Sequence, residues 1–301
     1  MLYLFPAISR RRTKFDFVSY FHQVVAETNI SGPWSLRHSK FAVYATKGRR
    51  AKMFDRFVIM DNGKPGLDAV WGVAILDGHT CRYFCDKAEC YLLPIIIETI
   101  IREKTSNHEV IAKTIQEELI KFDILIMKNI PEHSLCATTA TIAVCHSGIT
   151  YIFHLGDNRA LISSAKGTLA TLDHTFQLDS PLLHIADLPL RVLEEARMLH
   201  FNRALGARAL KEMGVVSNIA AISAVSLTSQ DGYGHLLLAS NGLWKAISND
   251  EAIDTFLQYE NEELFGAKQL VEKALKKGAR DNISVVIVKF RPPKKVMEGL
   301  E

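Results

Sequence analysis

Short apolar runs separated by turn residues dominate the hydrophobic pattern and predict β-strands in several groups. The predicted strands cover, in chain order, residues 41–44, 56–60, 70–76, 139–145, 150–155, 159–163, 236–240 and 283–290. Asn-Gly, Asp-Gly and Ser-Gly pairs lie between many of them and indicate tight turns. The strands occur in runs and do not alternate regularly with helices.

Longer stretches with a helical period separate these runs of strands. We expect helices over about 81–103, 109–128, 250–258 and 267–277, and a helical then irregular segment over 190–212. In the second stretch Ile111, Ile115, Leu119 and Phe122 share one face, which is typical of an amphipathic helix. Runs of strands followed by runs of helices predict an α+β fold and argue against a βαβ repeat.

Composition indicates an ordinary globular protein. Of the 301 residues, 48% are hydrophobic and 23% charged, enough to bury a sizeable core. The net charge of +3 is too small to indicate a nucleic acid or an anionic membrane as partner. The longest apolar stretch is interrupted by Pro94 and Glu98, and the N-terminal apolar run is shorter than a secretory signal. We expect a soluble intracellular protein, cytoplasmic, nuclear or both, and monomeric.

The five cysteines do not suggest a disulfide framework. Their odd number in a long chain without a signal sequence predicts reduced thiols. Cys81, Cys85 and Cys90 lie close together, but their spacing is not that of a zinc motif and the segment begins an apolar helix. We therefore expect no cysteine metal site.

Three acidic residues stand beside Gly or Asn at the ends of predicted strands: Asp77, Asp157 and Asp281. Taken singly, each is best interpreted as a turn former whose carboxylate bonds its own backbone. Strand-end carboxylates from distant segments can also converge on Mg²⁺ or Mn²⁺, which prefer oxygen ligands.

Taken together and in order, several segments resemble the metal-dependent protein phosphatases of type 2C. The matching blocks are 48–56, 72–79, 155–160, 173–174, 203–206, 238–244 and 280–285. The resemblance implies a four-layer α-β-β-α sandwich of two antiparallel sheets flanked by helices. It places a phosphatase-like domain at 41–291, after an extension at 1–40 and before a tail at 292–301. Active members hold two Mg²⁺ or Mn²⁺ ions that activate a water against phosphoserine or phosphothreonine.

The resemblance also assigns metal ligands. Asp77 matches the residue that bridges the two metals, and Gly78 supplies a backbone carbonyl. Asp281 matches the final ligand, and Asp157 an acid linked to a third, weaker metal. Asn241 stands where the family has a ligating Asp and still offers a neutral carbonyl oxygen.

Two further residues match the family's reaction site. Arg50 occupies the position of the phosphate-binding arginine. His79 matches a histidine that can serve as general acid, although with the metals in doubt a structural hydrogen-bonding role stays open. His174 is better interpreted as a turn or core residue.

Four positions depart from the family pattern: Phe54, Asn241, Lys245 and Ala207 each replace an acid. Two of these, Phe54 and Asn241, replace two of the four acids of the two-metal centre. Lys245 is either a solvated side chain, which we favour, or a cation substitute that pairs with Asp157; plant relatives resemble the chain at this position. The stretch between Arg197 and Arg203 is also shorter than usual, which predicts a truncated flap.

Losing two anions should weaken a pair of mutually repelling dications, so one weakened Mg²⁺ or Mn²⁺ site is expected before two. The sequence therefore predicts an impaired or inactive phosphatase domain that acts as a binding or regulatory module for a phosphoprotein or regulatory partner. Two alternatives stay open: a low-rate Mg²⁺/Mn²⁺-dependent serine/threonine phosphatase, and a structural relic without ligand. A Phe54 side chain turned away from the site would favour the low-rate enzyme.

Overall fold

The structure of the chain is a computed structural model. It describes residues 18–21, 33–38, 40–64, 69–103, 105, 107–164, 167–176, 194, 199–226 and 234–290. Within the predicted segment 190–212, residues 190–193 and 195–198 lie outside these residues, whereas residue 194 and residues 199–212 are described.

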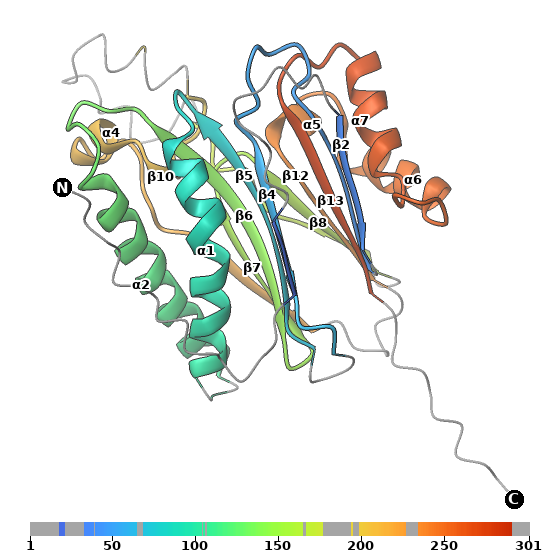
Figure 1. Ribbon diagram of the computed structural model, residues 1–301, viewed down its shortest axis with the longest axis horizontal. Helices are drawn as coiled ribbons and strands as arrows, with labels where there is room; N and C mark the ends of the chain where they lie inside the picture. Colours follow the sequence, from blue (N-terminus) through green and yellow to red (C-terminus); the bar gives the residue numbers. More distant parts are fainter. Residues whose placement is uncertain are drawn as a thin grey trace, which may run out of the picture.

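Two antiparallel sheets stack face to face in the middle of the fold (Figure 1). In the described residues the first sheet contains, in spatial order, β1 (Val18–Phe21), β4 (Arg56–Asp61), β5 (Trp71–His79), β6 (Ala137–His146), β7 (Ile149–Leu155) and β11 (Ala221–Ser226), with β10 (Leu205–Gly206) on β6. The second sheet contains β2 (Pro33–His38), β3 (Phe41–Thr46), β13 (Ile283–Lys289), β12 (His235–Ala239), β8 (Arg159–Ser164) and β9 (Gly167–Ala170).

Helices cover the outer face of each sheet (Figure 1). Helices α1 (Tyr83–Arg102) and α2 (His108–Met127) flank the first sheet, and α6 (Asn249–Tyr259) and α7 (Ala267–Lys276) flank the second. Two short helices, α4 (Arg208–Glu212) and α5 (Asn241–Trp244), lie near strand ends. The predicted α+β class and the four-layer sandwich are both confirmed.

Alternating side chains on the strands build three apolar layers. On β5, Trp71, Val73 and Ile75 pack between the two sheets, while Ala74 and Leu76 pack under α1 and α2. Strand β13 repeats the pattern on the other side, because alternate residues of a strand face opposite ways. Strands buried on both faces read as continuous apolar runs, which is why these segments were predictable.

Strand β5 continues further than the sequence indicated. The apolar run stops at Leu76, but Asp77, Gly78 and His79 keep pairing with β6. Asp77 is therefore inside a strand, not at its end, and shares a strand face with His79 because they are two residues apart.

Part of the N-terminal extension joins the sandwich. Residues 18–21 pair with β4, and residues 33–38 pair with β3. Both strands precede residue 41, where the phosphatase-like domain was expected to begin. Among the helices that the structure describes, none combines the length and apolar character of a membrane span.

Cys81 and Cys136 form a disulfide, which differs from the expectation of reduced thiols. His79 pairs with Ala137 at the end of the β5–β6 ladder, so the two cysteines meet just beyond it. This contact depends on strand register, which a separation of 55 residues does not reveal. Cys85, Cys90 and Cys145 are free.

Acidification is expected to destabilise the fold through His154, a buried residue on β7. Its ring bonds the Thr141 hydroxyl and the Leu172 carbonyl, and burial lowers the pKa of His154 from 6.5 to about 4. The unfolded chain therefore takes up a proton between these values that the folded chain excludes, and stability falls as the pH falls through this window. At pH 5 the expected loss from this group is about 2 kcal/mol relative to neutral pH.

Urea unfolding at pH 7.5 and pH 5 measures this effect. His154→Gln should show a smaller difference between the two pH values than wild type, even if it is less stable at both. An equal pH difference in the two proteins would refute the assignment to His154.

Candidate functional site

A cavity of about 530 Å³ lies where the end of β5, the loop before β4, helix α5 and the loop before β13 meet. It collects most of the residues singled out from the sequence. Its lining includes Arg50, Phe54, Asp77, Gly78, His79, Asn241, Lys245 and Asp281. Segments separated by more than 200 residues thus converge on one cavity.

Asp281 is held by two basic side chains. The Arg50 guanidinium donates from Nε and Nη2 to the two carboxylate oxygens, at 2.9 and 3.0 Å, and Lys245 Nζ lies 3.5 Å from Oδ2. Burial alone would raise the pKa of Asp281, but the Arg50 hydrogen bonds and the Lys245 charge together lower it. Lys245 is about half exposed and pairs with Asp281, not with Asp157 as one hypothesis had it.

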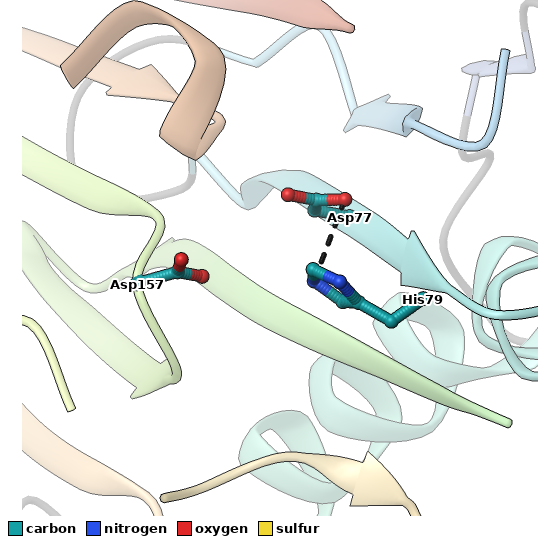
Figure 2. Close-up of side chains that lie close together, drawn as sticks. All are labelled: Asp77, His79 and Asp157. Atoms are coloured by element: carbon teal, nitrogen blue, oxygen red, sulfur yellow. Dashed lines mark ion pairs between the residues drawn. The ribbon is translucent and has the colours of Figure 1, made fainter. Parts of the chain in front are cut away.

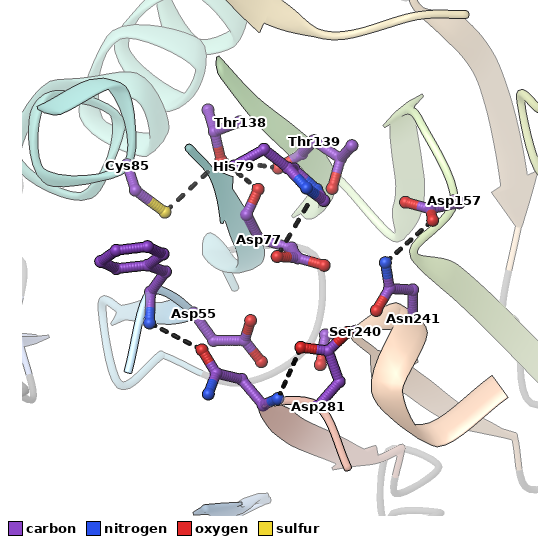
Figure 3. A network of polar contacts seen from close by, with 12 residues as sticks. Asp55, Asp77, His79, Cys85, Thr138, Thr139, Asp157, Ser240, Asn241 and Asp281 are labelled. Carbon is purple, nitrogen blue, oxygen red and sulfur yellow. Dashed lines mark hydrogen bonds and ion pairs between the residues drawn. The ribbon is translucent and has the colours of Figure 1, made fainter. Parts of the chain in front are cut away.

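Asp77, His79 and Asp157 form a second group deeper in the site (Figure 2). One ligand-type atom from each lies within 4.8 Å of the others. Asp157 comes from the turn between β7 and β8 and accepts a 2.8 Å hydrogen bond from the Asn241 amide (Figure 3). Burial, then the neighbouring Asp157 and Asp281 charges, raises the pKa of Asp77 well above its usual value. Burial also lowers the pKa of His79.

Asp55 is a buried neighbour of Asp77 (Figure 3). It is almost fully buried, and its Oδ2 accepts a 2.9 Å hydrogen bond from the Ser284 hydroxyl. Desolvation, and then the charge of Asp77, raises the pKa of Asp55 well above its usual value. Asp55 joins the β4 and β13 segments and is not among the residues that line the cavity.

Asn282 was not predicted as a site residue, yet it joins the loop of residues 47–54 to the loop before β13. Its Oδ1 accepts from the Phe54 backbone N–H at 2.7 Å, and its amide donates to the Lys47 and Lys52 carbonyls. These three hydrogen bonds hold the loop that carries Arg50 against the loop that carries Asp281. The adjacent Asp281-Asn282 pair was the only sequence signal.

Position 54 supplies no side-chain oxygen, because it is a phenylalanine. Phe54 is partly exposed and lines the cavity beside Gly78. Its Cβ and carbonyl oxygen lie so close to Gly78 that a Cβ at position 78 would be 3.2 and 3.0 Å from them. Phe54 therefore forms part of the cavity lining beside Gly78.

Ala207 and His174 lie outside the cavity lining. Ala207 is fully buried in a small cluster with Phe201 and Leu210 and donates its N–H to the Cys136 carbonyl. His174 stacks on His154 and accepts a hydrogen bond from the Gly156 N–H. His174 thus has the structural role expected for it.

The model of the family described as Protein phosphatase 2C matches residues 39–283. The chain belongs to the protein phosphatase 2C family. Protein phosphatase 1L of Bos taurus is 26% identical over 298 residues, covering 91% of this chain and 79% of that protein. "Probable protein phosphatase 2C 28" of Arabidopsis thaliana is 27% identical over 268 residues, covering 86% and 76%.

Solved structures show the same fold. A serine-threonine phosphatase 2C from Toxoplasma gondii aligns with a TM-score of 0.69 at 20% identity, over 87% of this chain and all of that one. A C. elegans sex determining protein aligns with a TM-score of 0.65 at 22% identity, over 86% and 66%. The chain is thus a phosphatase 2C-like domain with the fold of that family.

Proposed function

We propose that this phosphatase 2C-like domain binds phosphorylated protein segments at the cavity and does not hydrolyse them. The observation that carries the proposal is the double hydrogen bond from Arg50 to Asp281. It commits a carboxylate of the family's metal centre to a basic side chain.

The donor set does not fit a centre of two divalent ions. Of the four acids that such a centre uses, position 54 is a phenylalanine, position 241 is an amide, and Asp281 is neutralised by Arg50 and Lys245. Two dications a few ångströms apart repel strongly and need several anions between them. Of these four positions, only Asp77 has a carboxylate without an ion pair to a described lysine or arginine. The residues present therefore do not support hydrolysis by a pair of metal ions.

The same basic residues suit a phosphate group. The Arg50 side chain is 62% exposed, and its bonds to Asp281 use Nε and Nη2, which leaves Nη1 without a hydrogen bond among the described residues. Lys52 and Lys245 line the cavity around it. A guanidinium pairs with phosphate through two parallel hydrogen bonds, and the ammonium groups add charge without fixed geometry.

Binding of a phosphothreonine peptide in EDTA, followed by fluorescence anisotropy, tests this proposal without metal. We expect wild type to prefer the phosphorylated peptide over its unphosphorylated form, and Arg50→Ala to lose about tenfold or more in affinity, which is about 1.4 kcal/mol. Arg102→Ala is the matched control, because its side chain is also 62% exposed and lies at the far end of α1. Equal binding of both peptides, or no effect of Arg50→Ala, would overturn the proposal.

The low-rate phosphatase remains the second candidate. It is favoured by the acidic group of Asp77 and Asp157 with His79 beside them, which keeps one cluster able to hold a cation. Hydrolysis of the same phosphorylated peptide decides between the two functions.

A further inference from the structure

The spacing of His79 and Asp77 is that of two ligands on one metal ion. His79 Nε2 lies 3.6 Å from Asp77 Oδ1, too far for a good hydrogen bond. Two ligand atoms each about 2.1 Å from a tetrahedral ion lie about 3.4 Å apart. The third atom, from Asp157, is within 4.8 Å of both, so a small inward shift brings all three onto one centre (Figure 2).

Several buried polar atoms on these neighbouring residues lack a hydrogen-bond partner among the described residues. They are His79 Nε2, Asp157 Oδ1 and Asn241 Oδ1. Asp157 is 5% exposed and Asn241 4% exposed. A buried polar atom without a hydrogen bond is unfavourable by about 1–3 kcal/mol, so such atoms on neighbouring residues favour a bound ligand here. Figure 3 shows that Asn241 and Asp157 lie next to each other on the side of the cluster opposite β5.

The charge balance suits one dication. Arg50 and Lys245 lie on Asp281, and among the described residues no lysine or arginine forms an ion pair with Asp77 or Asp157. A metal ion binds the deprotonated form of each carboxylate, so one ion at this buried place would meet two negative charges. One divalent ion offsets both, whereas two ions would leave excess positive charge.

The ring of His79 is held in place for such a role. It packs against Phe201 with ring centroids 4.7 Å apart. The next residue, Thr80, has a φ of 63°, a left-handed conformation that a β-branched residue rarely adopts. The chain thus turns sharply directly after His79 and leaves its ring at the end of β5.

We propose that the chain binds a single divalent transition-metal ion, such as Zn²⁺, through Asp77, His79 and Asp157, with the Asn241 carbonyl oxygen as a further donor. The imidazole nitrogen favours Zn²⁺ over Mg²⁺, which prefers oxygen donors and keeps its waters. This site uses neither Asp281 nor position 54, and it goes beyond the proposed phosphopeptide binding without depending on it.

Calorimetric titration of Zn²⁺ into the EDTA-treated and dialysed full chain tests the proposal. We expect one equivalent of Zn²⁺ to bind, and Mg²⁺ to bind about 100-fold more weakly or not at all. His79→Ala and Asp157→Asn should each weaken Zn²⁺ binding by about tenfold or more. His133→Ala, which removes an exposed histidine that belongs neither to the cluster nor to the cavity lining, is the matched control and should keep the wild-type affinity within about threefold.

Asp281→Asn distinguishes this site from the family's arrangement. It should leave one equivalent of Zn²⁺ bound with an affinity within about threefold of wild type. Loss of Zn²⁺ in Asp281→Asn, no binding by wild type, equal affinity for Mg²⁺, or unchanged binding in both His79→Ala and Asp157→Asn would each overturn the proposal. Far-UV circular dichroism checks that the variants fold, and His79→Gln replaces His79→Ala if the latter does not. Since the peptide measurement is made in EDTA, failure of this metal site and failure of the proposed function are separate results.

Discussion

Replacing Arg56 by methionine is expected to lower the free energy of unfolding by about 3–5 kcal/mol. Arg56 is 1% exposed, and its side chain contacts the loop before β4, which also carries Arg50. Its guanidinium donates to the Met53 and Asp55 carbonyls at 3.0 and 2.8 Å and to Asp86 at 2.8 Å, with Glu89 at 3.4 Å from Nε. Methionine has a similar length but leaves two carbonyls and a buried carboxylate without a donor.

Adding Glu89→Gln to Arg56→Met separates the loss of charge pairing from the loss of packing. Burial raises the pKa of Glu89 to about 7, and the Arg56 charge opposes this rise. Without Arg56, Glu89 becomes an unpaired buried acid, so adding Glu89→Gln should recover part of the lost stability. Urea unfolding of the two variants measures this, with Arg102→Met as the exposed control. A loss below about 1 kcal/mol in Arg56→Met, or no recovery in the double variant, would contradict the account.

Gly48→Ala is the second substitution with a large expected effect. Gly48 has a φ of 60°, and a Cβ there would lie 2.2 Å from the Asp281 carbonyl oxygen. The added methyl group must push apart the loops that bring Arg50 to Asp281. We expect a loss of about 3 kcal/mol or more in unfolding free energy, together with weaker phosphopeptide binding.

Gly63→Ala is the matched control for Gly48→Ala. Gly63 has a similar φ of 70°, but nothing lies within 4 Å of a Cβ placed there. It should therefore show only the left-handed backbone penalty of about 1–2 kcal/mol and unchanged peptide affinity. Equal losses in the two variants would show that backbone conformation, and not the contact with Asp281, accounts for the effect.

Much of the fold was predictable because its strands are buried on both sides. The runs that became β4, β6, β7 and β13 are nearly continuous in apolar residues, and the helix at 249–259 begins at a capping box of Ser248 and Glu251. Strand β11, Ala221–Ser226, was missed, because its pattern is mixed and its pairing with β7 is a distant contact.

The candidate site was predictable residue by residue only through the family resemblance. Turn-forming aspartates are common, so Asp77, Asp157 and Asp281 alone predicted no shared cavity. Contacts across the fold could not be predicted at all: the Arg50–Asp281 pair joins residues 231 positions apart, and the Asn282 side chain joins two loops that are distant in the sequence. Which cation neutralises which acid depends on these contacts, as the pairing of Lys245 with Asp281 illustrates.

The central claim is that this domain retains the fold and lacks a working two-metal centre. The most direct test is hydrolysis of a phosphothreonine peptide in Mn²⁺ by wild type, by Asp77→Ala as the blank, and by the double variant Phe54→Glu/Asn241→Asp. We expect wild type to hydrolyse the peptide no faster than the Asp77→Ala blank. The double variant should exceed the rate of the blank by about 100-fold, which corresponds to about 2.7 kcal/mol in the activation free energy. Turnover by wild type clearly above Asp77→Ala would contradict the claim and show that the altered site is catalytic.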